Sequence, residues 1–223
     1  MPQQDVPEVQ DMQNHTGRFI VIEGVDGSGI STQVARLHAW LEERTGGKVL
    51  ATKEPSEGPA GLVLRQALNK RLQGFSQEVL ALLFAADRLD HVNHQIRPAL
   101  DQGSHVICDR YLWSSLAYQG VSAGWEWVEA INAKALKPDL TLFVRVEPEI
   151  TMARIRNNRF QVDLFEQEAF LKRVLARFEH LVEKAQAEGE TVAVIDGSMP
   201  IESVATAIQD RVQAFWLDKQ SQF

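Results

Sequence analysis

The stretch GVDGSGIST, from Gly24 to Thr32, joins a short apolar run to a segment with helical spacing. The run RFIVIE (residues 18–23) is apolar and β-branched, which predicts a buried strand. The segment STQVARLHAWLEER (residues 31–44) has apolar residues three or four positions apart, which predicts a helix. A glycine-rich turn between a strand and a helix is typical of a phosphate-binding loop, because backbone N–H groups and the helix N-terminus attract anions.

The loop departs from the phosphate-binding consensus at one position. The consensus G-x-x-x-x-G-K-[ST] has lysine where this chain has Ile30, directly before Ser31. That lysine reaches the terminal phosphates of a nucleotide, whereas isoleucine has no donor. Two alternatives stay open from the residues alone, a dinucleotide-binding turn and a plain glycine-rich turn without a ligand. The glycine order G-x-x-G-x-G and the paired hydroxyls of Ser31 and Thr32 favour the phosphate-binding loop.

The rest of the chain alternates apolar strands with helical segments. Further strands are predicted at residues 48–53, 105–109, 139–146 and 191–196, and helical segments at 60–68, 77–102, 125–136, 148–157, 165–188 and 200–216. This pattern predicts an α/β fold, a five-stranded parallel sheet with helices on both faces. Ligands bind beyond the carboxyl ends of such strands, which places the loop, Glu54 and Asp109 along one rim. We expect one domain over residues 17–223, after a disordered tail at residues 1–16.

The composition restricts the class of protein. With 44% hydrophobic and 24% charged residues, the 223-residue chain has the make-up of an ordinary soluble domain. Its formal net charge of -7 argues against a nucleic-acid polymer as the main partner, but a small phosphorylated ligand needs only a few local cations. The single cysteine, Cys108, excludes an internal disulfide, and no apolar run has the length of a membrane span. We therefore expect a cytoplasmic protein.

Four further segments form a more specific pattern than the loop does. They are TKEPSEG (52–58), LLFAADR (82–88), CDRYLWSSLAYQG (108–120) and the arginine-bearing stretch that begins with EPEITMARIR (147–156). In order and spacing they resemble the thymidylate kinase family in its bacterial form, over about residues 17–215. The resemblance implies a P-loop nucleoside monophosphate kinase-like fold, ATP and Mg²⁺ as cofactors, and dTMP as the acceptor. It also implies a homodimer, for which the helical stretch at 77–102 could supply a face.

Phe84 and Arg88 are the core of the predicted acceptor site. They lie four residues apart on a predicted helix, so they share a face. A ring beside a guanidinium suits a nucleobase, since the ring stacks and the guanidinium donates to a base oxygen. From the residues alone, core packing of the ring and pairing of Arg88 with a carboxylate stay open. By resemblance the two residues hold thymine, and the acceptor set is Asp26, Glu54, Arg65, Phe84, Arg88, Arg110, Ser115, Tyr118 and Gln119.

The resemblance gives four of these residues separate roles. Arg110 holds the dTMP phosphate, Arg65 reaches the same phosphate, and Asp26 accepts a hydrogen bond from the 3′-hydroxyl. Tyr118 lies where a 2′-hydroxyl would clash, which favours deoxyribose. The ordinary alternatives are an ion pair for Arg110, a solvated helix arginine for Arg65, and an Asp-Gly turn at Asp26. For Tyr118 the alternative is a half-buried core residue.

The predicted ATP-binding residues are those of the loop itself: Gly24, Val25, Asp26, Gly27, Ser28, Gly29, Ile30, Ser31 and Thr32. Ser31 and Asp109 are the predicted metal ligands, because a hydroxyl and a rim carboxylate can hold Mg²⁺ and orient its shell. By resemblance, the catalytic residues are Asp109, Arg154, Arg156 and Arg159, whose guanidinium groups neutralise charge during transfer. A charged surface helix is the ordinary alternative for the arginines.

Ile30 leaves two functional hypotheses open. Loss of one preorganised donor to the transition state costs about 10²–10³ in rate. The first hypothesis is a thymidylate kinase that converts ATP and dTMP to ADP and dTDP, slowed by Ile30 unless Lys53 or an arginine replaces the charge. The second is a catalytically weak relative that binds nucleotide and acts through a partner. Ile30, at the lysine position, and Leu164, where arginine is usual, favour the second hypothesis. The retained acceptor pattern favours the first.

Overall fold

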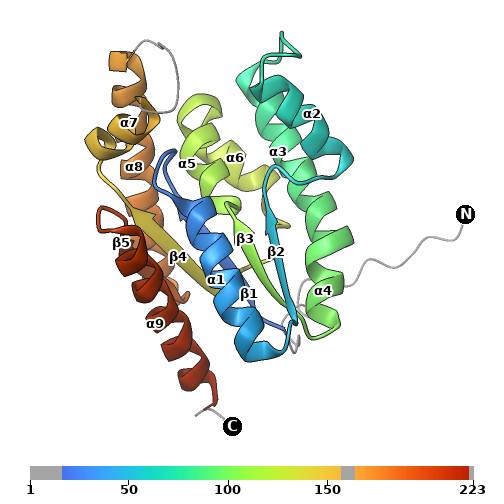
Figure 1. The fold of residues 1–223 in the computed structure, drawn as a ribbon. Coiled ribbons are helices and arrows are strands. Elements are labelled where there is room, and N and C mark those ends of the chain that lie inside the picture. The colour runs from blue at the N-terminus through green and yellow to red at the C-terminus, as the bar shows by residue number, and fades with distance from the viewer. Residues whose placement is uncertain (1–16, 157–163, 221–223) are drawn as a thin grey trace, which may run out of the picture.

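The computed structural model describes residues 17–156 and 164–220, with backbone alone at 155–156, 164–167 and 217–220. The predicted tail at residues 1–16 lies outside this range. The elements, labelled in Figure 1, are β1 (Phe19–Gly24), α1 (Ile30–Thr45), β2 (Val49–Lys53), α2 (Pro59–Leu68), α3 (Gln77–His91), the π-helical turn η2 (Val92–Ile96), α4 (Arg97–Asp101), β3 (His105–Asp109), α5 (Leu112–Ala123), α6 (Trp125–Ile131), β4 (Leu140–Arg145), α7 (Pro148–Arg156), α8 (Leu164–Ala187), β5 (Val192–Asp196) and α9 (Ile201–Gln220).

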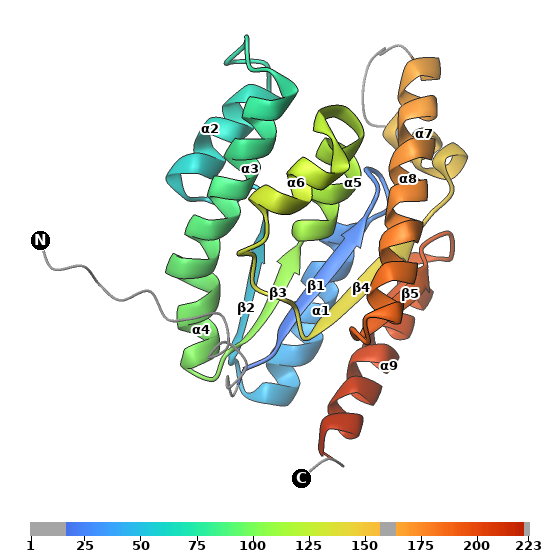
Figure 2. The ribbon, with the colours of Figure 1, turned by 180° about the vertical axis from the view of Figure 1, so that it is seen from behind.

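The five strands form one parallel sheet in the order β2-β3-β1-β4-β5. The predicted α/β fold is therefore confirmed. Asp109 of β3 pairs with Ile22 of β1 on one side and with Lys53 of β2 on the other, so the three strands end together. Figure 2 shows the arrowheads of β1 and β3 pointing toward the end of the molecule that holds the β1–α1 loop. The loop, Glu54 and Asp109 thus lie along one rim of the sheet, as predicted.

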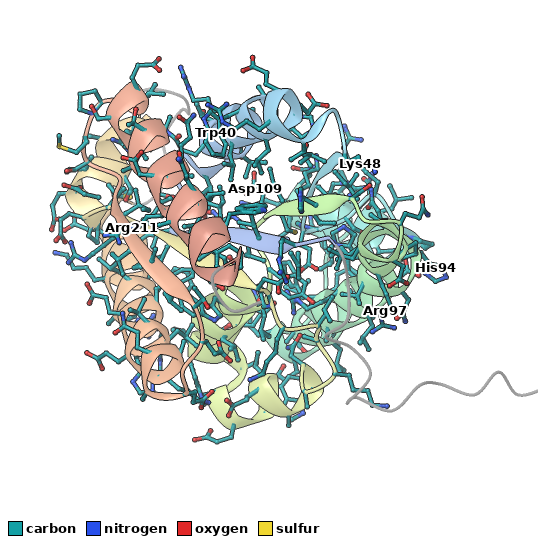
Figure 3. All side chains as sticks on the ribbon, turned by 90° about the horizontal axis from the view of Figure 1, so that it is seen from below. Trp40, Lys48, His94, Arg97, Asp109 and Arg211 are labelled. Atoms are coloured by element: carbon teal, nitrogen blue, oxygen red, sulfur yellow. The ribbon has the colours of Figure 1, made fainter. Side chains whose placement is uncertain are left out.

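The central strand β1 is buried on both faces. Ile20 and Ile22 pack with side chains of α1 and α9, whereas Phe19 and Val21 pack with side chains of η2, α4 and β3. Figure 3 looks along the molecule from below and shows α1 and α9 on one side of the sheet, with α6 on the opposite side. Burial on both faces explains why β1 is a continuous apolar run without polar alternation.

The structure corrects three helix predictions. The stretch predicted as one helix at 77–102 consists of α3, the π-helical turn η2 and α4, and the helix predicted at 125–136 ends at Ile131. Residues Leu112–Ala123 form α5, for which no helix was predicted. Serine and glycine within α5 lower its helix propensity. Packing of Trp113 and Leu116 against α8 stabilises it instead, and that contact is not visible in the local sequence.

Candidate active site

The glycine-rich loop forms a tight turn ahead of α1. The Ser28 N–H donates to the Val25 carbonyl at 3.1 Å, and Gly27 has a φ of 82°, which glycine adopts without steric cost. A Cβ on Gly24 would lie 2.6 Å from Ser28 Oγ and 2.8 Å from a β4 carbonyl oxygen, so only glycine fits there. Gly29 is the N-cap of α1 and no side chain caps this end. The N–H groups of the first turn are therefore open to an anion.

The side chains of Val25 and Ile30 anchor this loop in the protein core. Val25 is fully buried among side chains of α5 and α8, on one face of the sheet. Ile30 is 4% exposed and packs in the cluster of α1, β1 and α9, on the other face. Ser28 is also buried, and its hydroxyl has no hydrogen-bond partner among the residues that the structure describes. The loop is thus anchored in the core on both faces of the sheet.

Ser31 and Asp109 meet at the rim of the sheet. The Ser31 hydroxyl donates to Asp109 Oδ2 at 2.5 Å. A hydroxyl and one carboxylate fit Mg²⁺, which binds proteins through one or two such groups and takes its other ligands from phosphates and water. Among the side chains that the structure describes, no group of three or more from His, Cys, Asp or Glu could hold a metal ion. The residues therefore fit a magnesium ion that is bound together with a nucleotide.

Arg110 connects the loop to the neighbouring cavity. Its Nη1 donates to the Gly24 carbonyl at 3.1 Å and its Nη2 to Asp26 Oδ1 at 2.7 Å. Its φ of 65° is unusual for a residue other than glycine, and its backbone N–H is held by the Ile22 carbonyl at 3.0 Å. The Asp26 N–H in turn donates to the Tyr118 hydroxyl at 2.8 Å. Burial raises the pKa of Tyr118, and the Asp26 charge adds to this effect, so the hydroxyl is neutral.

A cavity of about 260 Å³ opens beside Arg110. With one exception, every predicted acceptor residue lines it: Asp26, Glu54, Phe84, Arg88, Arg110, Ser115, Tyr118 and Gln119. The exception is Arg65 of α2, which donates to the carbonyls of Pro55 (3.4 Å) and Ser56 and pairs with Glu57 at 3.1 Å. The structure thus brings the loop, the metal-ligand pair and the acceptor set together at one rim.

Arg88 is the centre of a buried polar network in the cavity wall. The side chain is 1% exposed, and its Nη2 lies 2.7 Å from Glu54 Oε2 and 3.0 Å from both the Tyr111 carbonyl and Ser115 Oγ. Nη1 donates to Asn132 Oδ1. Arg88 therefore pairs with a carboxylate, which was the ordinary alternative for it, and it also lines the cavity. The buried Nε–H has no partner in the described part of the chain.

His91 belongs to the same network, although the sequence analysis did not select it. Its Nδ1 lies 3.3 Å from Glu54 Oε1 and its Nε2 lies 2.7 Å from Thr52 Oγ1. Because a carboxylate only accepts, Nδ1 carries the proton and the Thr52 hydroxyl donates to Nε2. The spacing contained a signal for this role. His91 follows Arg88 by three positions, which places both on one face of α3.

Glu23 is a second residue that the sequence analysis missed. It is fully buried at the end of β1, where it accepts from the Tyr111 N–H at 2.9 Å and the Ser114 hydroxyl at 2.6 Å. Burial raises its pKa to about 7, although the Ser114 hydrogen bonds and the Arg110 charge act in the opposite direction. Glu23 thereby fixes the start of α5 against the loop. The sequence signal that could have identified Glu23 was a charged residue at the end of an apolar strand.

Arg154 of α7 contacts the loop from the other side. Its Nη1 donates to the Gly27 carbonyl at 3.4 Å and its Nη2 to the Gly197 carbonyl, between β5 and α9, at 3.0 Å. Of Arg156 only the backbone is described, as the last residue of α7, and Arg159 lies outside the described residues. One of the three predicted catalytic arginines is thus placed beside the phosphate-binding loop.

Comparison with known proteins gives a consistent result over most of the chain. The family model described as Thymidylate kinase matches residues 22–208. The chain is similar to a thymidylate kinase of Clavibacter michiganensis subsp. michiganensis, with 40% identity over 206 residues, covering 89% of this chain and 96% of the relative. A thymidylate kinase of Nitrosomonas eutropha is 37% identical over 207 residues, covering 90% and 94% respectively. One of Symbiobacterium thermophilum is 40% identical over 201 residues, covering 87% and 92%. Within the described ranges, no helix is both long and apolar enough to cross a membrane.

Proposed function

The chain belongs to the thymidylate kinase family, and we propose that it transfers the γ-phosphoryl group of ATP to dTMP, giving ADP and dTDP. The observation that carries this proposal is the cavity beside the phosphate-binding loop. Phe84 and the buried Arg88, four residues apart on α3, both line it. An anion-binding loop next to a base-sized cavity is the arrangement that a nucleoside monophosphate kinase requires.

The wall formed by Phe84 and Arg88 suits the thymine base. A half-buried ring offers a stacking surface, and the guanidinium of Arg88 in the cavity wall suits a base oxygen. Ser115 and Gln119 complete the wall toward the base and the sugar.

The other end of the cavity suits the sugar and phosphate of dTMP. Arg110 donates to the Gly24 carbonyl of the loop and also lines the cavity, so its guanidinium can hold the acceptor phosphate. Arg65 approaches the same phosphate from α2. Asp26 has a carboxylate oxygen beside the cavity to accept from the 3′-hydroxyl. Tyr118, whose hydroxyl accepts from the Asp26 N–H, lines the cavity, and its proposed role is to exclude a 2′-hydroxyl and so select deoxyribose.

The loop residues Gly24–Thr32 bind the ATP phosphates through their N–H groups and the open N-terminus of α1. Ser31 and Asp109 hold Mg²⁺, which, when bound, neutralises charge on the phosphate oxygens. Arg154 of α7 lies beside the loop, and we assign the same role in transfer to Arg156 and Arg159. Their positive charges offset the charge that develops during transfer.

We further propose that the protein acts as a homodimer. Exposed apolar side chains gather on α2, on α3 and on the connection between them: Leu62, Leu68, Leu72, Val79 and Leu82. Because α2 and α3 contact each other, these side chains lie on neighbouring elements that a second copy could cover. A cytoplasmic location suits the unpaired thiol of Cys108. The single sheet supports residues 17–223 as one domain.

The test is a coupled assay of ADP release with ATP, Mg²⁺ and dTMP. We expect release that depends on dTMP and a rise in melting temperature when dTMP is added alone. A rise in melting temperature without turnover would favour the nucleotide-binding relative that acts through a partner. If dTMP neither binds nor reacts, the proposed acceptor is wrong.

A further inference from the structure

Asn132 reaches the acceptor site through its contact with Arg88. It forms the C-cap of α6 and is 6% exposed. Its Oδ1 accepts from Arg88 Nη1, and its Nδ2 donates to the Val128 carbonyl at 2.8 Å. The amide of Asn132 therefore connects α6 to a side chain of α3 that lines the acceptor cavity.

The orientation of this amide is fixed by the chemistry of its two partners. A guanidinium only donates and a backbone carbonyl only accepts, so the oxygen of Asn132 faces Arg88 and its nitrogen faces Val128. The backbone of Asn132 is also held on both sides. Its N–H donates to the Glu129 carbonyl at 3.2 Å, and its carbonyl accepts from the Ala135 N–H at 2.9 Å. Asn132 is thus a preorganised acceptor for Arg88.

Asn132 holds the terminal nitrogen of Arg88 that the other partners leave. Glu54, Ser115 and the Tyr111 carbonyl all accept from Nη2. Among the residues that the structure describes, Asn132 alone accepts from Nη1. A guanidinium is a rigid plane, so contacts at both terminal nitrogens fix its direction, whereas contacts at one nitrogen leave it free to turn. Asn132 therefore completes the fixation of the Arg88 plane.

A fixed guanidinium can distinguish two pyrimidines that differ in one group. It donates and cannot accept, so it suits a base carbonyl and leaves a base amino group unpaired. A rigid site built to hydrogen-bond one group rejects an analogue that lacks it, because the polar groups of the site then stay unpaired. A guanidinium that is free to turn away from the amino group loses part of this discrimination.

We propose that Asn132 is a positioning residue that holds the Arg88 guanidinium for a base carbonyl and so sets the preference for thymine over a 4-amino pyrimidine. Asn132 acts through Arg88 and does not itself touch the nucleotide. The proposal rests on the proposed function, since it concerns the base of the proposed acceptor. It makes a claim about selectivity that can be measured by binding as well as by turnover.

The test compares dTMP with 5-methyl-dCMP, which keeps the methyl group and has an amino group in place of the carbonyl oxygen at position 4. The readout is the ratio of kcat/KM for the two nucleotides. Asn132→Leu has a similar shape but no acceptor, so the preference for dTMP should fall about tenfold, as for the loss of one hydrogen bond to a charged group. The loss should lie in KM for dTMP, with kcat changed less than about threefold, because Asn132 holds the binding group and not the reacting atoms.

Asn132→Asp separates this role from a structural role at the end of α6. Its carboxylate still accepts from Arg88 but cannot donate to the Val128 carbonyl. The proposal requires that Asn132→Asp keeps the native preference to within about threefold, even where the melting temperature falls. Equal losses of preference in Asn132→Asp and Asn132→Leu would overturn the proposal. Asn69→Leu is the matched control, because Asn69 is the exposed C-cap of α2, and it should leave the ratio unchanged.

Folding of each variant is checked first by circular dichroism and melting temperature. If Asn132→Leu does not fold, Asn132→Ala takes its place under the same criteria. A native chain that binds dTMP without turnover contradicts the proposed function alone, since the ratio of the two dissociation constants, measured by calorimetry, still tests Asn132. A native chain that treats the two nucleotides alike, or binds neither, refutes the role of Asn132.

Discussion

Replacing Glu54 by glutamine would leave the guanidinium of Arg88 buried without its counter-ion. The two residues are 6% and 1% exposed, and the distance from Arg88 Nη2 to Glu54 Oε2 is 2.7 Å. Glutamine has nearly the same shape as glutamate, and its carbonyl can still accept from Arg88. His91, on the other carboxylate oxygen, can adopt its second tautomer to accept from the new amide group. The substitution therefore removes a charge and little else.

Two estimates give a similar magnitude for this loss. Two unit charges 4 Å apart attract each other by about 4 kcal/mol at an effective dielectric constant of 20. Removal of one partner from a buried ion pair is destabilising by about 3–5 kcal/mol, because the other charge stays buried. We expect Glu54→Gln to lower the free energy of unfolding by about 3–5 kcal/mol. This is a large part of the stability of an ordinary domain, which is about 5–15 kcal/mol.

Urea unfolding at neutral pH, followed by tryptophan fluorescence, measures this change. The matched control is Glu190→Gln, because Glu190 pairs with the exposed Lys137 at 2.8 Å. An exposed pair of this kind contributes about 0–1 kcal/mol. A loss for Glu54→Gln no larger than that for Glu190→Gln would refute the argument that the buried charge pair stabilises the acceptor cavity.

Substitutions at Glu23, His91 and Tyr118 test three further contacts of the site. Because burial raises the pKa of Glu23 from 4.5 to about 7, the free energy of unfolding should fall as pH rises through this range. In Glu23→Gln, up to about 3 kcal/mol of this fall should disappear, as measured by urea unfolding at several pH values. The same dependence of the free energy of unfolding on pH in the native chain and the variant would contradict this prediction. His91→Leu removes the hydrogen bonds to both Glu54 and Thr52, so KM for dTMP should rise about tenfold with kcat nearly unchanged. Steady-state kinetics in which kcat alone falls would exclude this positioning role. Tyr118→Ala should reduce the preference in kcat/KM for dTMP over its ribose counterpart by about tenfold, and an unchanged preference would exclude steric selection.

The sheet and its rim were predictable because they follow from local signals. Each strand is an apolar run, and parallel strands bring their carboxyl ends to one edge, so Glu54 and Asp109 could be placed beside the loop. Helix α5 was not predictable in this way. Its sequence lacks a clear apolar stripe, and contacts with α8, more than forty residues later in the chain, stabilise it.

The buried network around Arg88 was predictable only in part. Phe84 and His91 share a helix with Arg88, so their common face follows from spacing. Asn132 lies 44 positions away in the sequence, and nothing in the residues around it indicates that it accepts from Arg88. The burial of Ile30 was missed for a different reason. The motif defines position 30 by its contact with phosphate, and so gives no indication that the side chain packs in the core.

The loop has two physical requirements at position 30, and Ile30 meets only one of them. The loop has to be anchored in the core, and a charge has to reach the phosphates. Lysine can meet both, because its aliphatic stem packs on apolar surface while its ammonium group extends to the ligand. Ile30 meets only the first, and burial of such a side chain stabilises the fold by about 1.5–3 kcal/mol. Together with Val25 on the opposite face of the sheet, it fixes the turn that presents the N–H groups. The second requirement is not met by the residue at position 30. Ile30→Lys should therefore raise the rate of transfer while lowering the melting temperature, and an unchanged rate would show that the missing lysine does not limit transfer.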